Sequence, residues 1–186
     1  MSKFLRIWAI LMMCGCALTL SAQDKQDMFN PVRASVTSQT IAPDARAAGL
    51  GDVGAATDPD AVSQYWNPAK YPFTISRAGV ALNYTPWLRQ LVNDMDLAYL
   101  AGYYRIGDYS AVSGSLRYFS LGEVMTSMDE NAMTINPYEM SLDVAYSLML
   151  SEKFSIAAAV RWIYSDLTWD YTSDTSPGSA FAADIA

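Results

Sequence analysis

Residues 139–150 read EMSLDVAYSLML, and this stretch decides the fold. Alternation with a period of two is the pattern of a β-strand with one apolar and one polar face. The stretch is also longer than the five or six residues of an ordinary strand. Its even-numbered positions are all apolar: Met140, Leu142, Val144, Tyr146, Leu148 and Leu150. Its odd-numbered positions are mostly small or charged: Glu139, Ser141, Asp143, Ala145, Ser147 and Met149.

The same alternation recurs from residue 74 onward. It predicts strands at roughly 74–85, 94–106, 109–121, 139–150 and 154–165, and a sixth that begins near residue 180. In 94–106 the apolar face is Met95, Leu97, Tyr99, Ala101 and Tyr103. In 109–121 the apolar residues Val112, Leu116 and Tyr118 alternate with the polar residues Ser113, Ser115 and Arg117.

The connections between these strands alternate in length, with tight turns at 107–108 and 151–153 and long polar stretches near 122–136 and 166–179. Long strands with an apolar outer face and a polar inner face, joined in this way, are typical of an outer-membrane β-barrel. Aromatic residues near the strand ends fit the girdles of such a barrel. A soluble β-sandwich also alternates, but its strands are shorter. We therefore predict an all-β fold, a transmembrane antiparallel barrel over residues 74–186.

Closed single-chain bacterial barrels have an even number of strands, at least eight, and a bilayer does not permit open sheet edges. Five strands and the start of a sixth fall short of that number. We therefore expect this chain to be the N-terminal part of a larger barrel.

Residues 1–22 have the pattern of an export signal. Lys3 and Arg6 precede an uncharged apolar run, 7–20, which is too short to cross a bilayer as a helix. Both cysteines, Cys14 and Cys16, lie inside the run, and a lipoprotein signal ending at Cys16 is the less favoured alternative. Cleavage after Ala22 would take the net charge from −7 to −9 and leave no cysteine or histidine. This composition excludes disulfides, thiol chemistry and histidine-based catalysis, and it argues against nucleic acid.

Residues 23–73 do not alternate, and they contain GLGDVG at 49–54, a literal G-x-G-x-x-G. A dinucleotide turn needs a strand before the glycines and a helix after them. Proline and aspartate interrupt both flanks, so the context fails and we predict turn and packing glycines. A cation site at Asp52, Asp58 and Asp60 is a weaker alternative, since EF-hand spacing is absent. We predict a short helix at 59–65 with Asp58 as its N-cap, ended by an extended Asn67 before Pro68.

Several strings together resemble a known family. YWNPA, at 65–69 before the first strand, is similar to the N-terminal region of FadL-like fatty-acid transporters. TIAPDARAAGLGDVGAATDPDAVSQYWNPAKY (40–71), YTPWLRQLVNDMDLAYLAGYY (84–104) and SGSLRYFSLGEV (113–124) resemble the PorV (LptO) family of the Bacteroidetes type IX secretion system. The resemblance implies a FadL-like barrel of 14 strands, of which this chain holds the first five or six. It also implies that residues 23–73 form an inward-folded hatch. The matching hatch motif comprises Gly49, Gly51, Gly54, Asp58, Asp60, Trp66, Asn67, Pro68 and Ala69.

The resemblance further implies an outer-membrane protein without catalysis or cofactor. Family members bind the C-terminal signal domains of secreted cargo and pass the cargo from the translocon to a cell-surface attachment complex. A FadL-like transporter of hydrophobic small molecules is the runner-up. An outer-membrane enzyme that uses Glu139, Asp143 and Arg161 is the third alternative, although charged lumen residues are normal in barrels. Candidate partner contacts in the long connections are Trp87, Leu88, Met125, Met128 and Met133, the methionines because flexible Met-rich surfaces adapt to varied partners.

Overall fold

A computed structural model describes residues 36–88, 94–125, 134–167 and 176–186. Within these ranges no helix has the length and apolar character needed to cross a membrane. The strands are β1 (Ala78–Pro86), β2 (Met95–Ile106), β3 (Ser110–Leu121), β4 (Val124–Met125), β5 (Thr134–Ile135), β6 (Tyr138–Ser151), β7 (Phe154–Asp166) and β8 (Gly178–Ile185). The helices are η1 (Thr37–Thr40), α2 (Ala45–Gly49), α3 (Ser63–Trp66) and η2 (Pro68–Phe73), of which η1 and η2 are 3₁₀ helices.

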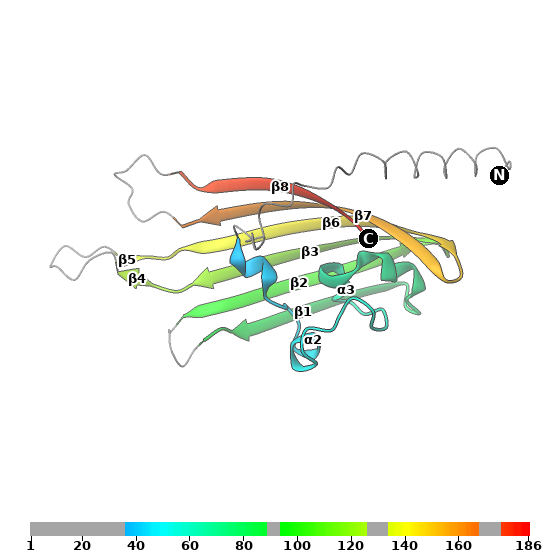
Figure 1. The fold of residues 1–186 in the computed structure, drawn as a ribbon, viewed down its shortest axis with the longest axis horizontal. Coiled ribbons are helices and arrows are strands. Elements are labelled where there is room, and N and C mark those ends of the chain that lie inside the picture. The colour runs from blue at the N-terminus through cyan, green and yellow to red at the C-terminus, as the bar shows by residue number, and fades with distance from the viewer. Residues whose placement is uncertain (1–35, 89–93, 126–133, 168–175) are drawn as a thin grey trace, which may run out of the picture. The chain divides into compact units, whose positions relative to one another are not determined.

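Six long strands form one antiparallel sheet in the order β1-β2-β3-β6-β7-β8, shown in Figure 1. Each strand except β1 and β8 has a partner on both sides, so these two are the edges of the described sheet. Between β3 and β6 the chain adds a small hairpin of β4 and β5. The all-β, antiparallel prediction is confirmed, and the strand bounds differ little from those expected. The main difference is that β1 begins at Ala78, because Thr74 is still capping η2.

Short and long connections leave opposite ends of the sheet (Figure 1). The turns after β2 and β6 are tight, and Gly107 adopts a left-handed conformation in the first of them, with φ of 74°. The connections after β1, β3 and β7 leave the other end, and parts of them lie outside the described residues. We call these ends the turn end and the loop end.

The two faces of the sheet differ as the alternation predicts on most strands. On β6, Leu142, Val144 and Tyr146 are exposed on the outer face, whereas Ser141 and Asp143 are buried on the inner face. Strand β3 shows the same division, and β7 follows it over most of its length. The sheet therefore presents an apolar outer surface and a largely polar inner surface.

Strand β2 departs from the prediction. Its odd-numbered apolar face points inward, where Leu97, Tyr99 and Ala101 are each 1 % exposed. The opposite face is apolar as well, with exposed Leu100 and Tyr104. Both faces of β2 are apolar, and the face that the alternation marked as apolar is the inner one. The physical reason is that the inner face of β2 packs against the chain that precedes the sheet.

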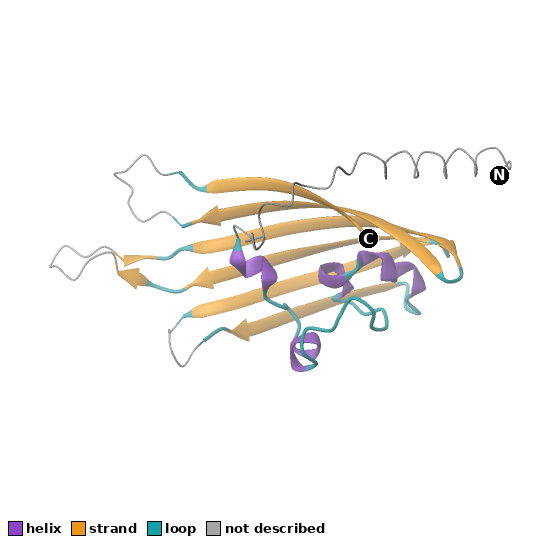
Figure 2. Cartoon of the chain, viewed as in Figure 1, coloured by secondary structure: helices purple, strands orange, loops and turns teal. Residues whose placement is uncertain are grey.

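That preceding chain, residues 36–73, is called the N-terminal segment here. Figure 2 shows its helices gathered on one face of the sheet. Val62 of the segment packs with Tyr99 and Ala101 of β2, and Tyr65 and Ala81 border this cluster. Helix η2 contacts β2, β3, β6 and β7. The N-terminal segment therefore covers the inner, largely polar face of the sheet.

Candidate functional site at the inner face

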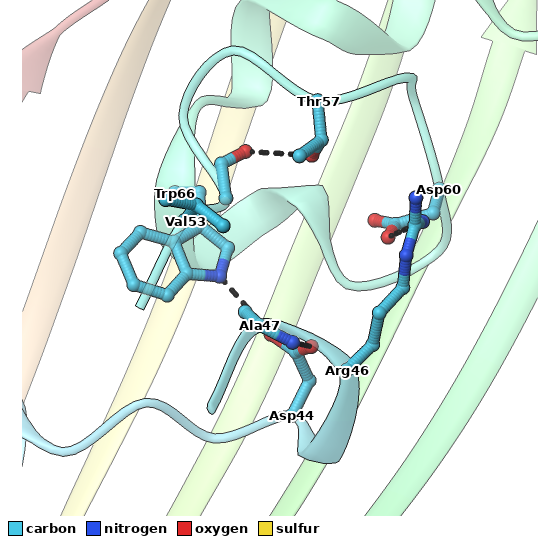
Figure 3. A pocket seen from close by; sticks show the side chains of 8 residues that line it. Asp44, Arg46, Ala47, Val53, Thr57, Asp60 and Trp66 are labelled. Carbon is cyan, nitrogen blue, oxygen red and sulfur yellow. Dashed lines mark hydrogen bonds and ion pairs between the residues drawn. The ribbon is translucent and has the colours of Figure 1, made fainter. Parts of the chain in front are cut away.

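The glycine string and the YWNPA string meet in the N-terminal segment. A Cβ atom on Gly54 would lie 2.3 Å from the indole ring of Trp66, so only glycine fits beneath that ring. The indole Nε1 donates to Asp44 Oδ2 at 3.0 Å, as Figure 3 shows. The other oxygen of Asp44 accepts from the backbone amide of Ala47 at 2.6 Å and caps helix α2. One carboxylate thus joins a helix start to the aromatic ring.

Helix α2 was not predicted from the sequence. The sequence does contain the pattern of a helix start there, because the N-cap residue Asp44 precedes the good helix formers Ala45, Arg46 and Ala47. The glycine string was read as a turn instead, and it does supply the turn that ends this helix. Gly51 has φ of 79°, and Asp52 follows with φ of 61°.

Among the described residues, helix α2 and no strand leads into the string, and residues 55–62 after it form no helix, so it lacks the strand and the helix that a dinucleotide would require. The cavity beside it, drawn in Figure 3, has a volume of about 10 Å³ and is lined in part by Gly54, Asp60 and Trp66. A cavity of that size holds about one water molecule.

The helix predicted at 59–65 is shorter and starts later than expected. Helix α3 begins at Ser63, because Asp60 and not Asp58 organises its start. Asp60 Oδ1 accepts from the amide of Val62 at 3.2 Å and from the hydroxyl of Ser63 at 2.8 Å. Its other oxygen lies 3.4 Å from Arg46 Nη1. Asp58 is exposed, and the described residues hold no cluster of three or more His, Cys, Asp or Glu side chains suited to a metal.

Asn67 ends helix α3 and begins η2. Its backbone is extended, with φ of −162° and ψ of 94°, as expected for a residue before proline. Its Oδ1 accepts from the amide of Ala69 at 3.0 Å, and both Pro68 and Ala69 are buried. The last part of the YWNPA string therefore forms a turn that directs the chain along the inner face of the sheet.

Lys70, which the sequence reading passed over, links η2 to the glycine string. Its ammonium donates to the carbonyl of Gly54 at 2.7 Å and to Thr57 Oγ1 at 3.2 Å. Burial lowers the pKa of this ammonium, while the charge of Asp60 opposes the shift. The hydrogen bonds to a loop carbonyl and a hydroxyl thus take the place of those that the Lys70 ammonium would make to water.

Polar side chains of the sheet hold the N-terminal segment in place. Ser113 Oγ donates to Gln64 Oε1 at 2.6 Å, and Arg105 Nη1 donates to the carbonyl of Thr74 at 2.6 Å. Tyr71 stacks on Tyr103 with the ring centroids 4.7 Å apart. These contacts lie on the half of each strand nearer the turn end. The alternation marked the polar face of 109–121, and the resemblance implied an inward-folded hatch, but neither identified the side chains that make these contacts.

Arg117 is the most buried cation of this interface. It is 1 % exposed, donates to the carbonyl of Ile41, and lies with Cζ 5.1 Å from the ring centroid of Tyr65. Burial raises the pKa of the Tyr65 hydroxyl, and the charge of Arg117 partly offsets that shift. Cation–π contacts of this kind gain strength when they are removed from water.

The charged trio raised as an enzymatic alternative is only partly assembled. Arg161 Nε forms an ion pair with Asp143, which also accepts from Ser115 Oγ at 3.2 Å. Arg161 Nη2 lies 3.7 Å from Asp184. Glu139 is buried and pairs with Ser165 Oγ at 3.4 Å. The group ties β6, β7 and β8 together.

Of the candidate partner contacts, Trp87, Leu88 and Met125 lie at the loop end, apart from the hatch motif. The amide of Trp87 donates to the carbonyl of Met95 at 2.8 Å, and Leu88 is exposed with φ of 51°. Met125 belongs to β4. Met128 and Met133 lie outside the described residues.

The outer face carries aromatic residues at both ends. Near the loop end, Tyr118, Tyr138 and Tyr164 form a row with ring centroids 5.7 and 6.0 Å apart, and Trp162 continues it. Phe154 is exposed at the turn end of β7. From Phe154 to Tyr164 the strand rises ~33 Å at ~3.3 Å per residue, and a tilt of ~40° makes that ~25 Å across a membrane. This matches the apolar band of an outer-membrane barrel, which is ~25 Å tall.

These features define the class: part of the wall of an outer-membrane β-barrel, with an N-terminal segment packed on its inner face. A comparison with protein-family models matches residues 22–186 to the type IX secretion system protein PorV, and the chain belongs to that family. It is therefore an outer-membrane component of the type IX secretion system, and the family is one of secretion components rather than enzymes. No curated protein matches the chain significantly.

Proposed function

We propose that this protein binds the C-terminal signal domains of secreted cargo and carries the cargo from the translocon to the cell-surface attachment complex. Family membership is the observation that carries the proposal. In this proposal residues 1–22 are a cleaved export signal and residues 23–73 are the hatch. The attachment complex and the translocon are then its protein partners, and outer-membrane lipid surrounds the barrel.

The distribution of contacts supports cargo binding at the loop end. At the turn end the inner face is occupied by α3 and η2. Ser113 contacts Gln64 of α3, Tyr103 stacks on Tyr71 of η2, and Arg105 contacts Thr74 directly after η2. In outer-membrane barrels short turns face the periplasm and long loops face the exterior. The exposed side chain of Leu88 then lies on the outside of the cell, where an emerging cargo domain would meet it.

A photo-crosslinking amino acid at position 88 of the full-length protein tests this proposal. We expect it to capture cargo through the signal domain, whereas the same probe at Lys153, exposed in the turn between β6 and β7, should not. Deletion of the gene should leave cargo unprocessed in the periplasm. Normal surface display in the deletion strain would overturn the proposal.

One observation favours a second candidate, a FadL-like transporter of hydrophobic molecules. Leu97 and Phe119 are register partners on the inner face, and both are buried, so this face carries an apolar pair near the loop end. The neighbouring inward positions Ser115, Arg117 and Asp143 are polar, which suits a lipid path less well. Fatty-acid uptake that depends on the protein would reverse the order of the two candidates.

A further inference from the structure

A basic pocket opens at the turn end of β1 and β2. It has a volume of about 310 Å³ and is lined by Ile75, Arg77, Arg105, Gly107 and Asp108. Arg105 donates from Nη1 to Thr74 and from Nη2 to the carbonyl of Asp108 at 3.3 Å, while its buried Nε has no hydrogen-bond partner among the described residues. The residues that line the pocket carry two guanidinium groups and one carboxylate. The pocket therefore favours an anion, and arginine suits phosphate in particular.

One residue that lines the pocket, Arg77, also contacts the membrane-facing side of the sheet. The guanidinium carbon of Arg77 lies 5.5 Å from the ring centroid of Tyr104, whose side chain is exposed on the outer face. Ile75, which lines the pocket, and Ile106, which follows Arg105, are also exposed. A cation, an amphipathic ring and exposed aliphatic groups together are what the boundary between headgroups and hydrocarbon requires.

A second hollow lies further along the same outer face. Gly102 of β2 and Gly114 of β3 are register partners, so two adjacent positions of the wall have no side chain. They leave an open apolar groove of about 310 Å³. Its walls include Val80, Leu100, Leu116, Leu142 and Val144.

The spacing of the pocket and the groove matches one lipid. From Gly107 to Gly102 the strand rises ~17 Å at ~3.3 Å per residue, or ~13 Å along the membrane normal at a tilt of ~40°. A single leaflet of hydrocarbon is ~15 Å deep. With the phosphate in the basic pocket, the far part of an acyl chain would therefore reach the groove.

We propose that this wall holds one phospholipid of the periplasmic leaflet. Arg77 and Arg105 bind its phosphate, one acyl chain follows Tyr104 and Ile106, and the chain ends in the groove at Gly102 and Gly114. The pocket lies at the rim of the turn end and the groove lies on the outer face, so the site does not depend on how cargo is bound at the loop end. A lipid held there would fix the level of the barrel in the membrane on the β1–β3 side.

Native mass spectrometry of the full-length protein, extracted from outer membranes in mild detergent, tests the headgroup part. Arg77→Gln should lower the retention of phosphatidylethanolamine about tenfold, the effect of losing one charge-assisted hydrogen bond. Lys153→Gln removes a cation from another turn at the same end and should leave retention unchanged. Equal retention in all three proteins would overturn the proposal. So would an equal loss in both variants, or specific retention of lipopolysaccharide in place of phospholipid.

Gly102→Ala tests the groove. Its Cβ would lie 3.3 Å from the carbonyl oxygen of Gly79, so the strand needs to yield by only a few tenths of an ångström. Wild-type protein should retain the sixteen-carbon form of the lipid better than the eight-carbon form, and the variant should lose that preference. Arg77→Gln should weaken both forms alike. An unchanged chain-length preference in a folded Gly102→Ala protein would overturn the assignment of the groove.

Discussion

The indole ring of Trp66 lies directly against the backbone of Gly54, where a Cβ atom would be only 2.3 Å from the ring. The same ring is fixed through Nε1 by Asp44. Two strings that look unrelated in the sequence, GLGDVG and YWNPA, are therefore the two sides of one contact. The glycine is required by an aromatic neighbour and not by a phosphate.

Gly54→Ala should loosen the N-terminal segment. A methyl group against the indole forces either the ring or the loop to move, at a cost of about 1–3 kcal/mol. Gly49→Ala is the matched control, because its Cβ meets nothing within 4 Å and the residue ends helix α2. Alanine there should be neutral or stabilising by up to ~1 kcal/mol. Thermal unfolding in detergent measures both, and equal effects would contradict the contact.

The strands could be predicted from the sequence because successive side chains of a strand point to opposite faces. The alternation therefore shows which residues share the face that meets lipid. Val112 on β3 and Leu142 on β6 are exposed on the apolar outer face as predicted. On β2 the pattern failed, because the inner face is apolar too and packs on Val62. A period of two gives the two faces of a strand, but the direction of each face depends on what packs there.

The candidate site was less visible in the sequence. The packing of Trp66 on Gly54 and the hydrogen bond from Ser113 to Gln64 join residues with no periodic relation between them. The start of α3 was misplaced by four residues, at Pro59 in place of Ser63, because residue type alone does not tell whether Asp58 or Asp60 organises it. Only the hydroxyl of Ser63, which donates to Asp60, decides between them.

The Lys70 ammonium makes the attachment of the N-terminal segment depend on pH. Burial lowers its pKa in the folded protein below 10.5, so the unfolded chain binds more protons. The stability of wild type minus that of Lys70→Met should be constant below the folded pKa and should rise as the pH increases from there to about 10.5. Buried Tyr65 and Tyr71 have raised pKa values and also contribute to the pH dependence. Both tyrosines are present in wild type and in Lys70→Met, so their contributions cancel in the stability difference between the two proteins. Paired thermal scans measure it, and a falling difference would contradict the burial of the amine.

Arg117 should be needed as arginine and not merely as a cation. Its planar group donates to the carbonyl of Ile41 and lies over Tyr65, and a lysine ammonium cannot reproduce both contacts. Arg117→Lys should cost ~2 kcal/mol or more. The rate of tryptic cleavage after exposed Arg46 would then rise about 30-fold or more, if cleavage follows the open population. Arg105→Lys, which also changes an arginine of the sheet, should affect cleavage there less, because Arg105 contacts Thr74 and not Ile41. Equal cleavage in wild type and Arg117→Lys would exclude this role.

The two carboxylates that contact Arg161 should differ widely in their contribution to stability. Asp143 is buried, pairs with Arg161 Nε and also accepts from Ser115, whereas the side chain of Asp184 is 55 % exposed and 3.7 Å from Nη2. Asp143→Asn should therefore cost about 2–4 kcal/mol, because it leaves a half-buried guanidinium without its closest charge. Asp184→Asn, the matched control, should cost less than ~0.5 kcal/mol, since exposed pairs contribute little. Heat-induced unfolding followed by gel mobility measures both. At a temperature where Asp143→Asn is folded, we expect normal cargo display, because the carboxylate binds Arg161 and so joins β6 to β7. Loss of a hydrolytic activity in folded Asp143→Asn would instead support the enzymatic alternative.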